Sequence, residues 1–559
     1  MLARLSIVLT LLAVVLIAPF ALRPSSDAGG LDAGDGERLV IITPHNESIQ
    51  AEFSRAFALH MKTTEGRDVF VDWRQPGGTS EIAKFLKSEY TTRFENLWKK
   101  ETGLPFTRNI REGFQDRKMG DALEQVIQQG YVDDLTGLHE RTEEELAAIA
   151  RALFLRSSIG VGIDLFFGGG AYDFSRQASI GTLVAKDDSG EFGPGALSAK
   201  RPGWFGDAIM PESVSGEPFR DEEFRWVGTV LSSFGIVYNE DVLERVGFER
   251  PLAQWDDLAD PRFFGQIALA DPTKSGSTTK AFEMLIQEQI QRLIAKGGLS
   301  EDEAVAAGWD TAMRMILKIS ANSRYFTDSA AKVPRDVALG DAAAGMCIDF
   351  YGRTFNEIYR SEDGGSHVQF VMPEGGTSIG ADPIGMLRGA PSPDLAHKFI
   401  EFVLSPAGQK LWNYQVGATG GPQRYALRRP PIRRDFYNEE NRPFQTDPEV
   451  NPYEIAESFT YHPEWTGSLF ASLRFVIKAA CIDPHEEQQA AWDRVRHEKP
   501  GSPGRMAFDD ISLISYDRVM ERIAPALGKK NKVIEISLAR EISSAFRKHY
   551  ESIVHGPES

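Results

Sequence analysis

The chain has 559 residues, more than a single hydrophobic core usually organises, so we expect at least two lobes. Apolar residues make up 42% and charged residues 25% of the sequence, which is typical of a globular protein and argues against wholesale disorder. The formal net charge of −18 argues against nonspecific binding to nucleic acid or to an anionic membrane, although it leaves room for a locally basic ligand site.

The N-terminus has the pattern of an export signal. Arg4 precedes an uncharged apolar run over 5–22, and a polar, Gly-rich stretch over 23–36 separates it from the first predicted strand. The run is about as long as the shortest bilayer-spanning helix, roughly 18 residues, and no Ala-x-Ala site follows it. We therefore predict export to the periplasm, with a cleaved signal peptide and an uncleaved anchor as alternatives.

The two cysteines, Cys347 and Cys481, lie far from the export segment, so we predict no lipid attachment there. Cys347 stands in an apolar run, which favours a buried free thiol over a disulfide. Whether the two cysteines pair is left open at this point.

Strands and helices alternate after residue 37. A β-branched run predicts a strand over 38–43, apolar residues at every fourth position predict a helix over 49–61, and 68–73 predicts a second strand. A second helix follows, with helical spacing of apolar residues over 82–90. Each helix begins after a turn rich in Gly, Ser, Thr or Asn, which is typical of an α/β sheet covered by helices.

The rest of the chain predicts a two-lobed organisation. Residues 91–160 are charged and lack strand-like runs, which predicts a helical insertion. The apolar run 159–167 predicts a strand, and the apolar run 227–238 predicts a hinge strand between the lobes. Apolar residues at helical spacing over 282–294 predict a long helix in the second lobe. The predicted division is an export segment and linker over 1–36, a first lobe over 37–232, a second lobe over 233–376, a return to the first lobe over 377–424, and an extension over 425–559 that packs on the first lobe.

Three predicted loops lead from a strand into a helix and carry hydroxyl or amide side chains. The first turn of a helix leaves backbone N–H groups free and bears partial positive charge, so it can hold an anion. Ligands of open α/β sheets bind at the carboxyl ends of the strands, where these loops lie. A helix cap alone explains any single loop, but together they predict ligand contacts at Thr43, His45, Asn46, Thr79, Ser80, Ser275, Ser277 and Thr278.

Gly168–Gly170 predict a further wall of the same cleft, because Gly169 and Gly170 allow close approach of the backbone to a ligand beside Tyr172. The spacing does not satisfy the dinucleotide fingerprint G-x-G-x-x-G with its acidic partner.

Residues 376–380 match G-x-S-x-G, the nucleophile elbow of serine hydrolases, with Ser378 at its centre. An elbow opens a helix, whereas Pro383 and the extended run 384–387 predict a strand here. A secreted serine hydrolase is therefore the weaker alternative, and we predict that the chain is not an enzyme.

The sequence contains no H-E-x-x-H or C-x-x-C pattern, which argues against a zinc site. A ferric ion prefers oxygen ligands with one imidazole, and His45 and Tyr351 are the candidates for such a site.

Six stretches carry a resemblance to the bacterial extracellular solute-binding proteins, in the family that includes ferric-ion-binding and hexose-phosphate-binding members. The resemblance covers 38–423, and the stretches are 42–47, 77–82, 166–174 (FFGGGAYDF), 234–240 (FGIVYNE), 255–272 and 396–409. It implies a periplasmic-binding-protein fold of class II, in which two α/β lobes joined by hinge strands close on a small ligand. It also implies an ABC permease and its ATPase as partners and no resident cofactor, and we expect a monomer.

In ferric-binding members, the family's metal ligands are a His in the first loop, an acidic residue after the strand that here ends at Phe167, and a Tyr-Tyr pair. Here His45 fits the first place, Gly168–Gly170 stand where the acid belongs, and Phe350-Tyr351 replaces the pair.

The resemblance therefore favours an anionic organic solute, such as a phosphorylated sugar or an organophosphonate, over a transported ferric ion. Asp349, Tyr351 and Arg353 are further predicted ligand contacts from the second lobe. A membrane-anchored sensory subunit is a further alternative.

Overall fold

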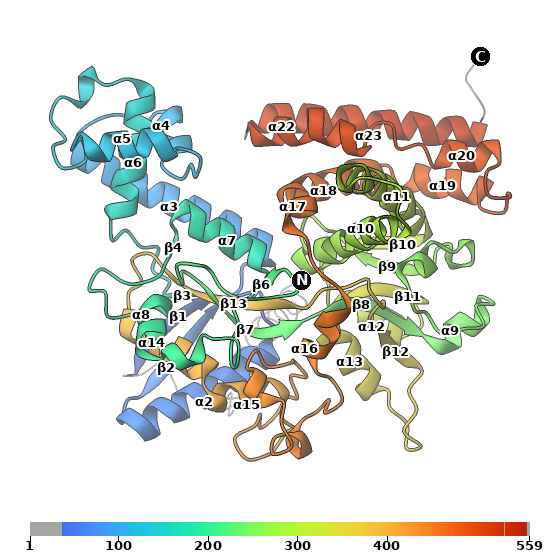
Figure 1. The fold of residues 1–559 in the computed structure, drawn as a ribbon, viewed down its shortest axis with the longest axis horizontal. Helices are drawn as coiled ribbons and strands as arrows, with labels where there is room; N and C mark the ends of the chain where they lie inside the picture. Colours follow the sequence, from blue (N-terminus) through green and yellow to red (C-terminus); the bar gives the residue numbers. More distant parts are fainter. Residues whose placement is uncertain (1–35, 530, 556–559) are drawn as a thin grey trace, which may run out of the picture.

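The computed structural model describes residues 36–529 and 531–555, and the predicted export segment lies outside them. Two mixed sheets, each covered by helices, form two lobes that lie side by side (Figure 1). This architecture confirms the predicted two-lobed α/β fold.

The sheet of the first lobe has the strand order β2-β1-β3-β13-β4, and β7 pairs with another part of β13. β1 is parallel to β2 and to β3, as strand–helix alternation predicts, whereas β13 is antiparallel to its neighbours. The predicted strand over 159–167 begins only at Leu165, because Gly162 adopts a left-handed backbone with φ 77°. The strands are β1 (Glu37–Ile42), β2 (Val69–Arg74), β3 (Leu165–Phe167), β4 (Leu183–Val184), β7 (Val227–Ser232) and β13 (Gly380–Leu387).

Helices cover both faces of this sheet because successive side chains of β1 point to opposite sides. Leu39 and Ile41 pack with one group of helices, and Val40 and Ile42 pack with the other. The first group is α2 (Glu47–Glu65), α14 (Pro393–Leu404) and α15 (Pro406–Asn413), with α8 (Pro194–Lys200) beside α14. The second group is α3 (Thr79–Thr102), α6 (Glu143–Arg156) and α7 (Ala171–Ile180).

The predicted helical insertion is helical, but its first boundary differs from the prediction. α3 continues without a break through residue 91 and ends at Thr102. α4 (Arg108–Gly113), α5 (Gly120–Gln128) and α6 then form the part that projects from the first lobe, at the upper left of Figure 1.

The sheet of the second lobe has the order β10-β9-β11-β8-β12. Its strands are β8 (Phe234–Asn239), β9 (Ile267–Ala270), β10 (Ser323–Thr327), β11 (Ala344–Ile348) and β12 (Val368–Val371). One face is covered by α10 (Gly276–Lys296) and α11 (Glu301–Asn322), and the other by α12 (Lys332–Ala338) and α13 (Asp349–Ile358), while α9 (Glu240–Arg245) follows β8.

The predicted hinge strand over 227–238 is two strands instead of one. β7 belongs to the sheet of the first lobe and β8 to that of the second, and only Ser233 lies between them. The chain returns beside this crossing, where the backbone N–H of Phe234 donates to Thr377 Oγ1 at 3.2 Å. The lobes are therefore joined by adjacent crossing segments, which is the arrangement expected of a hinge.

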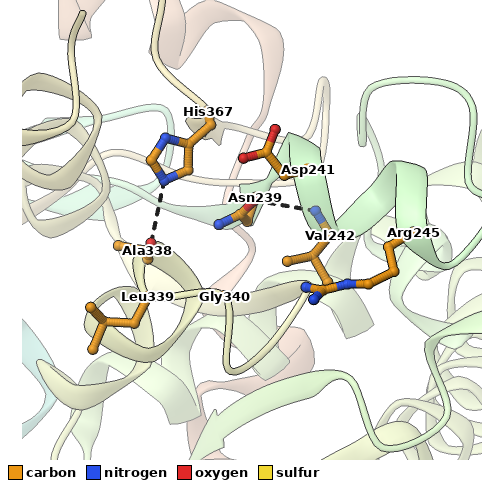
Figure 2. A pocket seen from close by; sticks show the side chains of 8 residues that line it. All are labelled: Asn239, Asp241, Val242, Arg245, Ala338, Leu339, Gly340 and His367. Atoms are coloured by element: carbon orange, nitrogen blue, oxygen red, sulfur yellow. Dashed lines mark hydrogen bonds between the residues drawn. The ribbon is translucent and has the colours of Figure 1, made fainter.

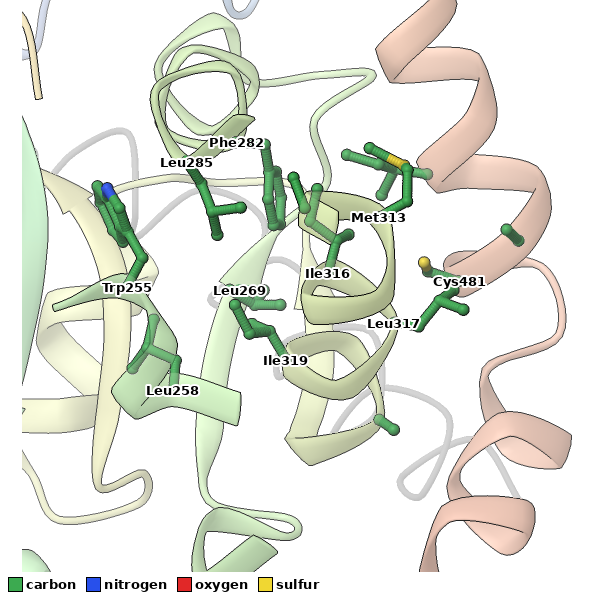
Figure 3. Packing of buried hydrophobic residues seen from close by; sticks show 14 of the residues in the cluster. Trp255, Leu258, Leu269, Phe282, Leu285, Met313, Ile316, Leu317, Ile319 and Cys481 are labelled. Carbon is green, nitrogen blue, oxygen red and sulfur yellow. The ribbon is translucent and has the colours of Figure 1, made fainter. Parts of the chain in front are cut away.

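The C-terminal extension corrects a prediction, because it packs on both lobes rather than on the first alone. Leu427, Ile432 and Ala456 join the core of the first lobe, but from Trp465 onward the apolar residues join the core of the second. Figure 3 shows Cys481 of the extension beside Leu317 of α11. The apolar stripe of the extension fits the outer face of α10 and α11, and a stripe alone does not reveal which partner it meets.

From Pro452 onward the extension is mainly helical. The short hairpin β5 (Ser213–Val214) and β6 (Glu217–Pro218) of the first lobe lies against it, since the N–H of Tyr461 donates to the carbonyl of Ser215 at 2.8 Å. Its helices are α16 (Pro452–Ile455), α17 (Pro463–Thr466), α18 (Phe470–Ile477), α19 (His485–Val495), α20 (Pro503–Phe508), α21 (Tyr516–Arg518), α22 (Ala524–Gly528) and α23 (Lys532–His555).

One helical stretch in the described part of the chain, Pro463–Ile482, is long and apolar enough to cross a membrane by length and composition. In this structure 61% of its most apolar window is buried. Packing against α10 and α11 accounts for its apolar character, as in a core helix.

Both cysteines are buried and unpaired. Cys347 lies on β11 and Cys481 lies in the extension, so no disulfide joins the extension to the second lobe.

Glu52 of α2 anchors the start of the extension. Its buried carboxylate accepts hydrogen bonds from the backbone N–H groups of Gln423, Arg424 and Tyr425. Burial by itself would raise the pKa of Glu52, but these hydrogen bonds outweigh it, and the pKa lies below 4.5.

We expect Glu52→Gln to lower the free energy of unfolding by about 1–3 kcal/mol at pH 7, because an amide cannot accept all three hydrogen bonds. A depressed pKa stabilises the fold above pH 4.5 and loses this effect as the pH falls through the folded pKa, so the difference from wild type should shrink in acid. Urea unfolding at pH 7 and pH 4 measures both. Glu124→Gln, at an exposed site on α5, is the control and should change stability by about 0.5 kcal/mol or less.

Candidate functional site between the lobes

The first predicted loop is held in place by its own hydrogen bonds. Thr43 Oγ1 donates to the carbonyl of Phe167 at 2.7 Å and accepts from the N–H of His45 at 3.0 Å. Asn46 caps α2. A Cβ atom on Gly168 would lie 2.4 Å from His45 Nε2, so glycine is required there by the imidazole ring that lies against it. The loop thus brings His45 against Gly168–Gly170, the glycine turn.

His45 lies beside a buried ion pair that the sequence did not predict. Arg429 of the extension contacts Asp382 of β13 at 2.7 Å, and its other terminal nitrogen lies 3.4 Å from His45 Nε2. Ser232 Oγ accepts from Arg429 at 2.9 Å and donates to Asp382 at 3.0 Å. The side chain of Arg429 is 1% exposed.

The charges in this cluster follow from burial and pairing. Burial lowers the pKa of His45, so the imidazole is neutral at neutral pH. Burial would raise the pKa of Asp382, but the nearby Arg429 guanidinium and His45 reverse the effect, and its pKa is lowered. The cluster is therefore a neutral histidine beside one matched pair of charges.

Two residues of the second lobe close over this cluster. The Asn46 side chain lies beside the hydroxyl of Tyr351, and the guanidinium carbon of Arg429 lies 4.7 Å from the centre of the Phe350 ring. Burial raises the pKa of Tyr351, which disfavours the phenolate that a ferric ion binds. Within 36–529 and 531–555, no group of three or more His, Cys, Asp or Glu side chains is arranged to hold a metal ion.

Arg353 and Asp349, two predicted ligand contacts, bind each other instead. They form an ion pair at 2.7 Å one turn apart on α13, and Arg353 also lies 3.8 Å from Asp447 of the extension. Arg428 meets the same Asp447 at 2.7 Å. The charge of Arg353 is thus already balanced by two carboxylates.

The second and third predicted loops meet across the junction of the lobes. A Cβ atom on Gly78 would lie 2.7 Å from the carbonyl oxygen of Lys274, and one on Gly169 would lie 2.8 Å from the Thr79 side chain. Ser80 is buried, and its hydroxyl has no hydrogen-bond partner among the described residues. The first turns of α3 and α10 therefore come from opposite lobes and share one site with the glycine turn.

The hydroxyl groups of the third loop mainly serve α10 itself. Ser275 Oγ accepts from the N–H of Thr278 at 3.2 Å and lies 3.0 Å from Ser277 Oγ. Gly170 is the N-cap of α7, and the ring of Tyr172 in the same helix packs at a tilt against Phe470 of the extension, with ring centres 4.5 Å apart. The extension therefore reaches the glycine turn as well.

The G-x-S-x-G segment leads into β13 instead of a helix, which removes the context of a nucleophile elbow. Ser378 Oγ donates to Glu217 at 2.6 Å. Glu217 also meets Lys280 of α10 at 2.8 Å, and Lys280 lies 3.0 Å from Glu283. Ser378 is therefore part of a buried ionic contact between the lobes.

A separate hollow of about 350 Å³ lies on the second lobe, away from these loops (Figure 2). It contains none of the predicted ligand contacts. Its lining residues are Asn239, Asp241, Val242, Arg245, Ala338, Leu339, Gly340 and His367.

We expect Arg429→Met to lower the free energy of unfolding by about 3–5 kcal/mol at pH 7, because Asp382 would stay buried without its partner. The double variant Arg429→Met/Asp382→Asn removes the unpaired charge and should recover part of the loss. Urea unfolding followed by fluorescence measures both. A double variant as unstable as the single one would show that packing, not charge, accounts for the effect.

Residues 206–425 match the family model described as bacterial extracellular solute-binding protein. The phosphoglycerate transport regulatory protein PgtC of Salmonella typhimurium is 22% identical over 185 residues, which are 33% of this chain and 40% of that protein. The putrescine/agmatine-binding protein of Pseudomonas aeruginosa is 22% identical over 192 residues, or 34% and 49%. The chain thus spans less than half the length of either relative.

Among solved structures, the periplasmic binding protein AfuA from Actinobacillus pleuropneumoniae, with fructose-6-phosphate bound, aligns with a TM-score of 0.41 at 17% identity. The alignment covers 67% of this chain and 81% of that one. The matched family region runs from the segment before β5 to just beyond Gln423, and it contains both crossing segments, the whole second lobe and β13. The matched region is less than half of the 559-residue chain, and it is similar to the bacterial extracellular solute-binding proteins.

Proposed function

We propose that the protein captures a small solute between its lobes and delivers it to an ABC importer. Two α/β lobes joined only by adjacent crossing segments and by the extension can open and close about that crossing. The predicted ligand-binding loops of both lobes lie where the lobes meet, through the contacts of Gly78 with Lys274 and of Asn46 with Tyr351. A permease and its ATPase are the partners that this role requires.

We further propose an anionic organic solute, such as a phosphorylated sugar or an organophosphonate. The observation that carries this proposal is the meeting of the first turns of α3 and α10, both more than twenty residues long, with the buried hydroxyl of Ser80 left without a partner. Backbone N–H groups at two helix starts, together with an unsatisfied hydroxyl, suit a phosphate or phosphonate group.

The other ligand classes have weaker support from the side chains. A polyamine needs unpaired carboxylates at both of its ends. Asp382 is paired with Arg429, and Glu217 and Glu283 are paired with Lys280, whereas Asp173 has no ion-pair partner among the described residues. A ferric ion needs anionic oxygen ligands, but glycine fills the place beside His45 and the phenol of Tyr351 stays neutral.

The proposed export of the protein depends on the N-terminal segment. Cleavage of this segment would release a soluble binder, whereas an uncleaved segment would leave an anchored sensory subunit. The intact mass of the mature protein, purified from the periplasm and from membranes, distinguishes these two forms.

We expect isothermal titration of the purified full chain to show binding of glucose 6-phosphate or 3-phosphoglycerate, and no binding of putrescine or ferric citrate. Ser80→Ala should weaken binding of the phosphate ester about 5- to 50-fold, because it removes a buried hydrogen bond to a charged group.

Ser88→Ala, an exposed serine on the same helix α3, is the matched control and should bind as the wild type does. Tight binding of putrescine or ferric iron, with none of the phosphate esters, would overturn the anionic class while leaving the solute-binding role intact.

A further inference from the structure

The C-terminal extension enters the junction of the lobes through α18. Phe470, the first residue of α18, packs against the ring of Tyr172 in the first lobe, and the helix also packs on α10 of the second lobe. Arg474 lies one turn after Phe470, with its guanidinium 4.7 Å from the centre of that ring. A cationic side chain from the extension is thus placed between both lobes.

The guanidinium of Arg474 is held at the first turn of α10. Its Nε donates to Thr279 Oγ1 at 3.0 Å, and that hydroxyl is fixed in turn because it donates to the carbonyl of Pro272 at 2.8 Å. A Cβ atom on Gly276 would lie 3.6 Å from Arg474 Nη2 and 3.9 Å from Asp173 Oδ2. Arg474 and Asp173 therefore both lie beside Gly276, at the first turn of α10.

Arg474 Nη2 is buried and has no hydrogen-bond partner in the part of the chain that the structure describes. The buried unpaired atoms of Arg353 and Arg429 are the inner Nε atoms, and one terminal nitrogen of each residue pairs with a carboxylate. No carboxylate lies within ion-pair distance of Arg474 in the same part of the chain. A terminal guanidinium nitrogen that is buried and unpaired has a strong need for an acceptor.

Residues from the first turns of several helices come together near Arg474. Asp173 stands in the first turn of α7, Gly276 in that of α10 and Ser80 in that of α3, and Asp173 is within electrostatic reach of both Arg474 and Glu81 of α3. Ser80 Oγ, like Arg474 Nη2, is buried and unpaired among the described residues. The extension therefore adds a charged donor to the place where three helices begin.

We propose that Arg474 is a ligand-binding residue that contacts the anionic group of the solute, so that the extension forms part of the binding site. This inference rests on the proposed anionic ligand. Asp173 beside the guanidinium can accept hydrogen bonds from hydroxyl groups of the same solute, so the ligand is a hydroxylated organic anion such as a sugar phosphate, and inorganic phosphate should bind more weakly.

The test is isothermal titration of glucose 6-phosphate and of inorganic phosphate into the full chain and its variants. Arg474→Met keeps the length of the side chain but removes its charge, and it should weaken binding of glucose 6-phosphate about 10- to 100-fold. Arg494→Met is the matched control in the extension, because the Arg494 side chain is 63% exposed; binding should stay within about twofold of wild type.

Arg474→Lys provides a second measurement in case the methionine variant does not fold. A lysine cannot both hydrogen-bond to Thr279 and reach the ligand, so we expect binding about 3- to 30-fold weaker than wild type. Wild-type affinity in either folded variant would overturn the role of Arg474 and leave the proposed ligand class in place. A wild-type chain that binds neither phosphate nor any phosphate ester would overturn both.

Discussion

The buried pairing of Arg429 with Asp382 is the interaction on which the arrangement between the lobes depends. A guanidinium that is removed from water must be neutralised, so the segment that carries it is fixed against β7, where the N–H of Leu231 donates to the carbonyl of Pro430 at 2.8 Å. Arg428 adopts a left-handed backbone conformation with φ 51°. As a result, the neighbouring side chains of Arg428 and Arg429 reach different carboxylates. His45 and Phe350 then pack against the fixed guanidinium, each from its own lobe.

The extension ties the two lobes together by contacts of very different kinds. Glu52 holds the start of the extension through three backbone N–H groups. Tyr461 of the extension packs against Lys280 of α10, with the lysine nitrogen 3.5 Å from the centre of the Tyr461 ring. Beyond Trp465 the contacts are apolar and belong to the core of the second lobe. The extension is thus bound to the second lobe by apolar contacts, and to the first lobe by polar contacts together with the apolar side chains of Leu427, Ile432 and Ala456.

The elements were predictable where the pattern was local. Apolar spacing located α2 and α10, and a β-branched run located β1, because one buried face dictates the period of each element. The strand before Phe167 was predicted too long, because its residues are apolar enough for a strand and only the backbone of Gly162 shows that the chain turns there. The partner of the extension was predicted wrongly, because its apolar stripe fits any complementary helix surface.

The sequence by itself determined the alternation of strands and helices, the two lobes and the small, hydroxyl-rich loops, since these follow from periodicity and from the chemistry of helix starts. Only the tertiary structure decided which of those groups meet. It brought Arg429 and Arg474, from a segment with no recognisable ligand motif, to the junction of the lobes. The reason is physical: a buried charge selects its partner by distance and desolvation, and neither is encoded in the spacing of residues along the chain.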